Sequence, residues 1–237
     1  MAKPQVATAL SLSSDQLTRS VEDYLKAIWT LSTDGASAST SEIAAHLALS
    51  APSVSGMVKR LCAQGLLSHE PYRGVTLTDD GRRAALRMVR RHRILEAYLV
   101  ERLGYTWDMV HVEAERLEHA VSDALVARMA EALGNPRVDP HGDPIPDADL
   151  VLVEEAYVAL ADVEVGETVV VRRVVGDEET ERLRYLATLG LVPGSVVTVI
   201  DRQPFDGPIV LRTGGATEAI GRALGRVVLC VRDGAAA

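Results

Sequence analysis

A proline-rich segment divides this chain into two parts with different sequence patterns. Residues 136–146 (PRVDPHGDPIP) contain four prolines, which cannot continue a helix. Before this segment apolar residues recur at helical spacing, and after it β-branched runs alternate with glycines. The sequence therefore predicts a mainly α protein with a C-terminal β module, and residues 136–150 are interpreted as a Pro-rich linker.

The pattern over residues 20–86 predicts a winged helix-turn-helix domain, in which two short helices and a β-hairpin follow a first helix. The expected elements are a helix from Ser20, a helix over residues 42–47 capped by Thr40 or Ser41, a helix over residues 52–64, and strands over residues 66–70 and 74–78. Residues 1–19 are polar and rich in small side chains, so we expect a flexible N-terminus.

Residues 87–135 are interpreted as a helical metal-binding and dimerisation domain. Helix-like sequence runs from about Asp80 to Leu133, with a break near Gly104. Its apolar residues offer more surface than two helices can bury between them. A homodimer accounts for this surplus, and DNA readers of this class commonly bind two half-sites.

Residues 151–237 predict a small β-barrel. Runs of β-branched residues separated by glycines indicate strands, and one helical pattern interrupts them. The expected strands cover residues 151–158, 163–175, 196–200, 209–211 and 226–231, and the helix covers residues 179–189.

Six potential metal ligands are crowded into 28 residues of helix-like sequence. They are His92, Glu96, His111, Glu115, Glu118 and His119. A four-residue step advances an α-helix by about 400°, so the members of each His/Glu pair lie on one face, one turn apart. On a single helix the last four of these ligands would form one stripe. Imidazole and carboxylate suit Mn²⁺, Fe²⁺ and Zn²⁺. A solvated helix face is the alternative for any one pair, but the whole cluster favours a metal site.

The third helix and the wing of the winged domain carry the residues that could contact DNA. Hydroxyl and amine side chains near the N-terminus of a recognition helix can reach base edges and phosphates. The candidates are Thr40, Ser50, Pro52, Ser53, Ser55, Lys59 and Arg60, with Tyr72 and Arg73 at the wing tip. The first turns contain no Gln or Asn, so shape readout is expected to matter more than bidentate base contacts. A protein-interaction module is the alternative for this domain.

The charge distribution fits DNA binding by the N-terminal third alone. The formal net charge is −8, yet residues 1–93 hold 12 Lys and Arg against 8 Asp and Glu, a net charge of +4. Cys62 and Cys230 are far apart and indicate reduced thiols in a cytoplasmic protein. No apolar run reaches the roughly 20 residues of a membrane span, so no membrane partner is expected.

Several motifs resemble the metal-dependent transcriptional repressors typified by the diphtheria toxin repressor. The resemblance covers residues 20–233 and rests on VEDYL at 21–25, APSVS at 51–55, RHR at 91–93, LEH at 117–119, PHGDPIP at 140–146 and GLVPGS at 190–195. Such proteins bind a divalent metal as co-repressor, dimerise through the middle domain and repress metal-uptake genes on double-stranded operator DNA. The resemblance also implies that the C-terminal module is an SH3-like barrel.

The same resemblance implies two groups of ligands. The main site would comprise Asp23, His92, Glu115, Glu118 and His119, and the ancillary site would comprise His92, Glu96, His111 and Glu179. Glu178 and Glu181 are alternatives to Glu179, and Arg182 stands where iron-sensing members have Gln. Because Asp23 belongs to the DNA-binding domain, a metal shared with the dimerisation domain would favour the spacing of recognition helices that matches two half-sites. His must be neutral to bind metal, so binding should weaken below about pH 6.

Manganese is the metal that this donor set favours, with iron as the alternative. Iron-sensing members use sulfur at two positions where this chain has Asp23 and Glu115, and the manganese-sensing branch has these carboxylates. Lys26 replaces a Glu of that branch, so a two-manganese cluster is expected to be incomplete. Binding of Zn²⁺, Cd²⁺ or Co²⁺ in vitro would be compatible, because the Irving–Williams order places Mn²⁺ weakest.

A metal-dependent hydrolase is the rival of another class. It would require an HExxH helix or loop-borne ligands around an open cleft, and neither pattern is present. We therefore expect no enzymatic activity and no small-molecule substrate. The histidines outside the cluster, namely His46, His69 and His141, are interpreted as structural.

Overall fold

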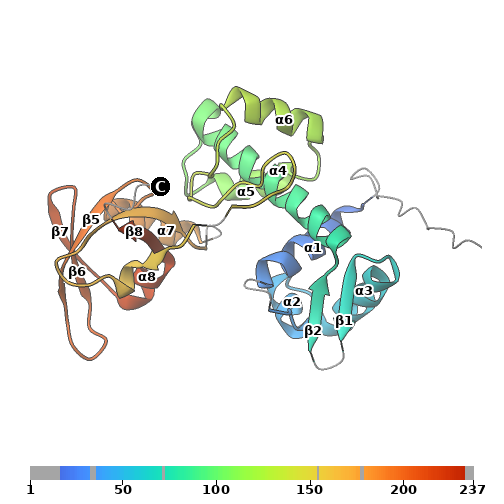
Figure 1. The fold of residues 1–237 in the computed structure, drawn as a ribbon, viewed down its shortest axis with the longest axis horizontal. Coiled ribbons are helices and arrows are strands. Elements are labelled where there is room, and N and C mark those ends of the chain that lie inside the picture. Colours follow the sequence, from blue (N-terminus) through green and yellow to red (C-terminus); the bar gives the residue numbers. More distant parts are fainter. Residues whose placement is uncertain (1–16, 33–35, 71–72, 154, 177–178, 233–237) are drawn as a thin grey trace, which may run out of the picture. The chain divides into compact units, whose positions relative to one another are not determined.

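The computed structural model describes residues 17–32, 36–70, 73–153, 155–176 and 179–232. They form two compact units, the first ending at Val89 and the second beginning at Arg90 (Figure 1). Residues 1–16 of the N-terminus expected to be flexible over residues 1–19 lie outside the described residues, as do Tyr72 and Glu178. No helix in the described ranges is long and apolar enough to cross a membrane.

The first unit contains the helices and the hairpin of a winged helix-turn-helix domain. Its elements are α1 (Arg19–Leu31), α2 (Thr40–His46), α3 (Ala51–Ala63), β1 (Leu67–Glu70), β2 (Gly74–Leu77) and the first part of α4 (Asp79–Leu103). The two strands are antiparallel, with Leu67 opposite Leu77. Val54, Val58 and Leu61 on one side of α3 pack into a core with Leu25 and Ile28 of α1.

The cap of α2 differs from the prediction. Ser39, rather than Thr40 or Ser41, is the N-cap, because its hydroxyl accepts a hydrogen bond from the Glu42 amide. The Glu42 carboxylate accepts one in return from the Ser39 amide at 2.8 Å. This reciprocal capping box starts the helix at Thr40, before the expected residue 42.

The helical part of the second unit has three helices where two were predicted. The rest of α4 is followed by α5 (Val110–Leu117) and α6 (Asp123–Ala132). The prediction missed the break between α5 and α6, where the Ser122 hydroxyl caps α6 by accepting a hydrogen bond from the Leu125 amide at 3.2 Å. Ile94, Val126, Ala130 and Ile145 pack together, so the proline-rich segment completes this core.

The proline-rich segment is therefore a packed part of the second unit and not only a spacer between domains. Residues 139–146 are buried apart from Pro140, which is half-buried. Val138 forms an isolated β-bridge with Pro144, and the Ile145 amide donates to the Arg137 carbonyl at 2.8 Å. Its prolines do prevent a helix, as predicted, but its path is fixed by packing.

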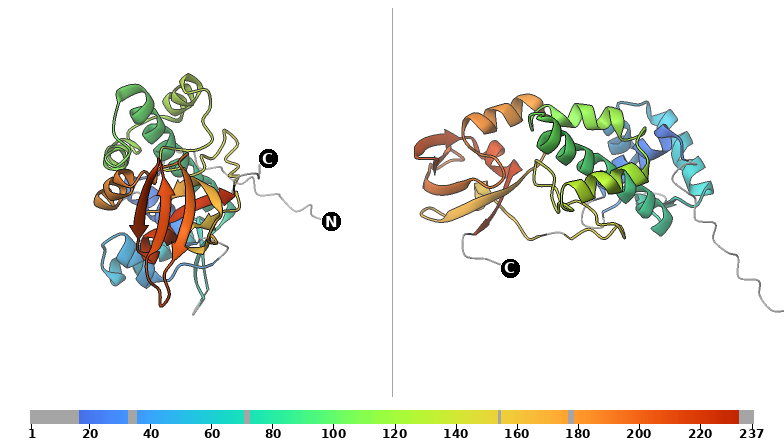
Figure 2. Two further views of the ribbon diagram at one scale, coloured as in Figure 1. Left: turned by 90° about the vertical axis from the view of Figure 1, so that its left-hand side faces the viewer. Right: turned by 90° about the horizontal axis from the view of Figure 1, so that it is seen from above.

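The C-terminal part is a six-stranded antiparallel sheet with the order β3-β8-β4-β5-β6-β7 (Figure 2, left). The strands are β3 (Val158–Ala159), β4 (Thr168–Val174), β5 (Val196–Arg202), β6 (Ile209–Thr213), β7 (Ala216–Ile220) and β8 (Val228–Arg232). The helices are η3 (Leu160–Asp162), α7 (Thr180–Thr188) and α8 (Arg222–Val227). Among the described residues of the predicted strand over 151–158, only Val158 lies in a strand. Both β7 and α8 were missed. This sheet module matches the predicted SH3-like fold class.

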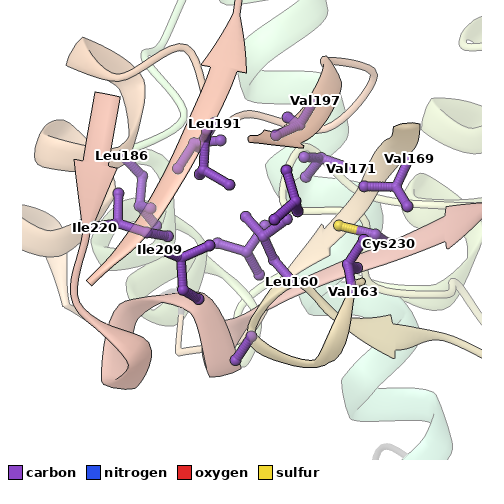
Figure 3. Packing of buried hydrophobic residues seen from close by; sticks show 14 of the residues in the cluster. Leu160, Val163, Val169, Val171, Leu186, Leu191, Val197, Ile209, Ile220 and Cys230 are labelled. Atoms are coloured by element: carbon purple, nitrogen blue, oxygen red, sulfur yellow. The ribbon is translucent and has the colours of Figure 1, made fainter. Parts of the chain in front are cut away.

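The barrel core is aliphatic and closely packed. Leu160, Val171, Val197 and Ile209 converge on its centre (Figure 3), and α7 adds Leu186. The Cys230 thiol lies among these side chains, and its burial raises the pKa to about 12. Both cysteines are free thiols.

Candidate metal centre and DNA-binding surface

Helices α4 and α5 bring together four of the six clustered ligands. His92 Nε2 lies 2.9 Å from Glu96 Oε1 and 3.1 Å from His111 Nδ1. Glu115 Oε1 lies 3.8 Å from His92 Nδ1 and 3.8 Å from His111 Nε2. Each His/Glu pair is one helical turn long, as its spacing predicts. We name His92, His111 and Glu115 the open group, because they can offer ligand atoms within 4.8 Å of one another and the Glu115 side chain is 41% exposed.

Glu118 and His119 are positioned by the end of α5 rather than by a continuous helix. Glu118 is the C-cap residue of α5, and His119 follows in a turn, so the single stripe of four ligands is wrong at its end. Glu118 is buried, and its Oε2 lies 2.6 Å from His92 Nδ1. His119 Nε2 lies 3.5 Å from Glu118 Oε1. The turn therefore keeps both residues beside the open group.

A second ligand group lies deeper in the second unit. Glu96 on α4, together with Asp139 and His141 from the proline-rich segment, can offer ligand atoms within 4.8 Å of one another. All three side chains are at most 1% exposed. We name them the closed group. Sequence reasoning included Glu96 but missed Asp139 and assigned His141 a structural role.

The hydrogen bond on the far side of His141 decides which ring nitrogen faces the closed group. His141 Nε2 lies 2.6 Å from the Trp107 carbonyl oxygen, which can only accept a hydrogen bond, so Nε2 carries the proton. Nδ1 then presents its lone pair 3.7 Å from Glu96 Oε2 and 4.0 Å from Asp139 Oδ1. A backbone carbonyl that orients an imidazole in this way is typical of histidines that ligate metal.

The two carboxyl groups of the closed group have opposite electrostatic surroundings. Burial disfavours ionisation of Glu96, but the charge of His92 and contacts with His111 and His141 outweigh it, so its pKa lies well below the ordinary value. Burial, together with the charges of Asp143 and Glu96, raises the pKa of Asp139 well above its ordinary value. Within the closed group, the surroundings therefore favour the ionised form of Glu96 and the protonated form of Asp139.

The residues of the closed group fit a divalent cation. Glu96 Oε2 and Asp139 Oδ2 are buried oxygens that make no hydrogen bond within the described part of the chain. Each has an ion-pair contact beyond hydrogen-bond distance, Glu96 Oε2 with His141 Nδ1 at 3.7 Å and Asp139 Oδ2 with Arg93 Nε at 3.6 Å. A cation bound between these oxygens could offset the remaining cost of burying them. Imidazole nitrogen and carboxylate oxygen together suit Mn²⁺, Fe²⁺ or Zn²⁺ rather than soft metals.

The predicted ligands from the barrel lie outside both groups. Glu179 Oε1 is paired with Arg182 Nη1 at 2.8 Å, and its side chain is 59% exposed. Among the described residues, neither Glu179 nor Glu181 joins a ligand group. Asp23 is half-buried on α1 of the first unit.

The predicted DNA contacts gather on α3 and the wing of the first unit. Ser50 is the N-cap of α3, and its hydroxyl accepts from the Ser53 amide, with Pro52 in the first turn. The outward residues Ser53, Ser55, Lys59 and Arg60 are all exposed. Thr40 opens α2 and is half-buried. Arg73 at the wing is 82% exposed and pairs with Glu70. Such a helix, polar on one face and apolar on the other, is typical of a recognition helix.

Family models match nearly the whole chain. Residues 16–75 match the iron-dependent repressor N-terminal DNA-binding domain, residues 78–147 the iron-dependent repressor metal-binding and dimerisation domain, and residues 158–232 the FeoA domain. The iron-dependent repressor IdeR of Mycobacterium tuberculosis is 34% identical over 199 residues, covering 78% of this chain and 85% of that protein. The chain belongs to the iron-dependent repressor family. It is a metal-responsive transcriptional repressor with DNA and a second copy of itself as partners, and not an enzyme.

Solved structures place this repressor beside manganese-dependent relatives. A manganese-dependent transcriptional repressor in complex with manganese is 44% identical, with a TM-score of 0.82 and coverage of 90% of this chain and 99% of that one. The structure of ScaR with bound Zn²⁺ is 32% identical, with a TM-score of 0.76 and coverage of 90% and 99%. The diphtheria toxin repressor of Corynebacterium diphtheriae is 31% identical over 208 residues, covering 84% of this chain and 91% of that protein.

A sequence signal for the two missed members of the closed group did exist in this repressor. Asp139 and His141 are two residues apart in a segment whose prolines favour extended backbone, so both side chains lie on the same side. Nothing in that segment, however, indicates that it folds back against α4. The pairing with Glu96 is a long-range contact.

Proposed function

We propose that this protein is a manganese-responsive repressor that binds operator DNA as a metal-activated homodimer and controls manganese-uptake or iron-uptake genes in the cytoplasm. The observation that carries the proposal is the donor set of the open group, two imidazoles and a carboxylate, with the Glu118 carboxylate 2.6 Å from His92. Nitrogen and oxygen donors suit Mn²⁺ and Fe²⁺. The manganese-dependent repressor at 44% identity supports manganese.

The chain's own residues divide the work of metal binding. His92 and His111 supply neutral nitrogens, and Glu115, Glu118 and His119 complete the proposed main site, with Asp23 as the proposed ligand from the DNA-binding unit. Glu96, Asp139 and His141 form a proposed second site. A bound divalent cation would neutralise carboxylates that otherwise repel one another.

Iron remains the second candidate for a specific reason. Two mycobacterial iron-dependent repressors named IdeR are 32% and 34% identical to this chain. Fe²⁺ accepts the same donors and binds more tightly than Mn²⁺ in the Irving–Williams order.

The proposed DNA interface is the exposed face of α3 with the wing. Ser53, Ser55, Lys59 and Arg60 would enter the major groove, and Ser50, Pro52 and Thr40 would approach the backbone. Arg73 and Tyr72 would contact phosphate from the wing. Each phosphate contact by Lys or Arg should make binding fall with salt concentration.

The homodimer is supported by apolar side chains that one chain leaves uncovered. Leu103, Tyr105 and Leu125 of the helical part are 60%, 38% and 43% exposed. A symmetric partner would bury such side chains against the same surface of the other copy.

A fluorescence-anisotropy titration tests the proposal. The labelled duplex would carry the promoter of the host's manganese transporter gene, and the protein would be titrated with Mn²⁺, with Fe²⁺ under reducing conditions, or with EDTA. We expect tight DNA binding only when metal is present. Relative to the range of each metal in the cell, the free Mn²⁺ concentration needed for DNA binding should be lower than the free Fe²⁺ concentration. Equal binding in EDTA would overturn metal activation, and a response to Fe²⁺ alone would replace manganese by iron.

Matched variants test, in the same assay, which residues act in metal binding and which act in DNA binding. Replacing Glu115 and His119 together by Ala should lower metal-dependent DNA affinity by about 100-fold while the dimer persists, since ligands are lost from the main site. Glu113→Ala is the control, because Glu113 lies on the same helix and only pairs with Arg116 on the surface. Lys59→Ala should weaken DNA binding and leave metal binding unchanged.

A further inference from the structure

The loop over residues 139–143, here named the ligand loop, contacts α4 on one side and the barrel on the other. Its side chains Asp139 and His141 face Glu96 and form the closed group. Its backbone faces β4, where the Val174 amide donates to the His141 carbonyl at 2.9 Å. The residue that supplies a ligand nitrogen is thus also hydrogen-bonded to a barrel strand.

Two further contacts hold the ligand loop against β4. Arg173 Nη2 lies 2.5 Å from Asp143 Oδ1, a carboxylate that is nearly buried. Gly142 has a φ of +87°, and a Cβ added there would lie 1.8 Å from the Arg172 carbonyl oxygen. Only glycine allows the backbones to approach this closely.

The opposite side of the ligand loop is held by Arg93 of α4. Its Nη1 donates to the Pro144 carbonyl at 2.5 Å, and its Nη2 donates to Asp143 Oδ1 at 3.1 Å. Asp143 therefore bridges Arg93 of α4 and Arg173 of β4. The two arginines fix the same carboxylate from two elements that are far apart in the sequence.

A second chain of contacts leads from His141 to the barrel. His141 Nε2 donates to the Trp107 carbonyl, and the Trp107 ring packs against the barrel core. The neighbouring Asp108 pairs with Arg184 of α7 at 2.6 Å. His141 thus lies between two anchor points of the barrel.

We propose that the ligand loop couples metal loading of the closed group to docking of the barrel on the helical part of the second unit, with Arg173 as the positioning residue. This inference rests on the proposed metal-responsive function. A shift of β4 that breaks the Arg173–Asp143 pair moves the His141 and Asp139 ligands away from Glu96, since only a few bonds of the loop separate Asp143 from these two residues. By thermodynamic reciprocity, a metal held by the closed group must stabilise the docked barrel.

Isothermal titration of the metal-free full chain with MnCl₂ tests the first direction. Asp139→Asn identifies the binding event that belongs to the closed group. Arg173→Ala should weaken that event by about tenfold, as expected for a residue that orients ligands, and should leave the event of the open group unchanged. Arg173→Lys should restore part of the affinity. Arg172→Ala is the matched control on the same strand, because its side chain is exposed and only its backbone meets Gly142.

Hydrogen exchange of the wild-type chain tests the reverse direction without any substitution. Mn²⁺ should slow exchange of the Val174 amide at least several-fold. The Val199 amide, which donates to the Glu167 carbonyl within the barrel, should not respond. Unchanged Val174 exchange with the closed group loaded, or full affinity in Arg173→Ala, overturns the coupling and leaves the proposed function intact. If Asp139→Asn removes no binding event from the wild-type titration, the closed group is not a metal site and the proposed second site fails instead.

Discussion

The open and closed groups begin one turn apart on α4, yet the protein surrounds them differently. Glu115 of the open group is 41% exposed and His111 is 19% exposed, whereas Glu96, Asp139 and His141 are at most 1% exposed. Ligands that water can reach exchange with the metal in solution. Ligands sealed by a folded loop exchange only when that loop opens.

This difference separates the roles expected of the two groups. The open group, on α4 and α5, is suited to follow the concentration of free metal. The closed group depends on residues that are distant in sequence, so it is suited to stabilise the second unit. Its members should therefore affect folding as well as metal binding, whereas Glu115, the most exposed member of the open group, should affect metal binding alone.

The largest expected effect comes from Glu96→Ala. Glu96 Oε1 lies within hydrogen-bond distance of both His92 and His111, and removing the carboxylate takes this partner from the buried His92 and the partly buried His111. We expect a loss of about 3 kcal/mol in the free energy of unfolding, as when one partner of a buried ion pair is removed. Urea denaturation in EDTA, followed by circular dichroism, measures it.

The matched variant on the open side is Glu115→Ala, which should stay within about 0.5 kcal/mol of wild type because its side chain is partly exposed. The pH dependence adds a second check. The pKa of Glu96 is depressed in the folded state, so its stabilisation is present above the ordinary value of 4.5 and is lost as the pH falls toward the depressed one. Equal losses in the free energy of unfolding for Glu96→Ala and Glu115→Ala would contradict the division between the open and closed groups.

Asp139→Asn should have an intermediate effect that appears mainly in metal binding. Burial raises the pKa of Asp139 and so favours its uncharged form, and the Asn amide is an uncharged group of the same shape. Its Oδ1 accepts hydrogen bonds from the His141 and Asp143 amides, and an Asn oxygen can do the same. Metal-free stability should fall by less than about 1 kcal/mol, while elemental analysis should find one metal ion fewer per subunit. A large loss of metal-free stability would show that Asp139 is ionised before metal binds.

The same two groups show how far sequence reasoning reaches. The His92/Glu96 and His111/Glu115 pairs follow from helical geometry, which is local, and the structure reproduces their one-turn spacing. Asp139 and His141 were not assigned to a site, because a proline-rich stretch has no period from which its path can be read. Its position is set by Arg93, which lies about 50 residues away in sequence.

Local capping explains the remaining errors in the fold. Ser39 and Ser122 each start a helix through one side-chain hydrogen bond. Near Ser39 the neighbouring hydroxyls of Ser37, Thr40 and Ser41 are equally plausible caps. β7 was missed because only Ile220 of its five residues is buried, so its sequence lacks the apolar alternation of a half-buried strand. The winged domain and the barrel were recognised because their longer elements have clear periods.

The smallest expected effect comes from Glu179→Ala. This variant tests whether the closed group includes a residue of the barrel. Sequence reasoning made Glu179 a ligand, but its carboxylate lies against Arg182, whose side chain also donates to the Gly176 carbonyl. An exposed ion pair of this kind contributes little, so metal affinity should change by less than about twofold. Mn²⁺ titration measures this change, and Glu181→Ala in α7 is titrated beside it because Glu181 is the alternative ligand. A loss as large as that of Asp139→Asn would make Glu179 a full ligand, and the closed group would then extend to α7 of the barrel.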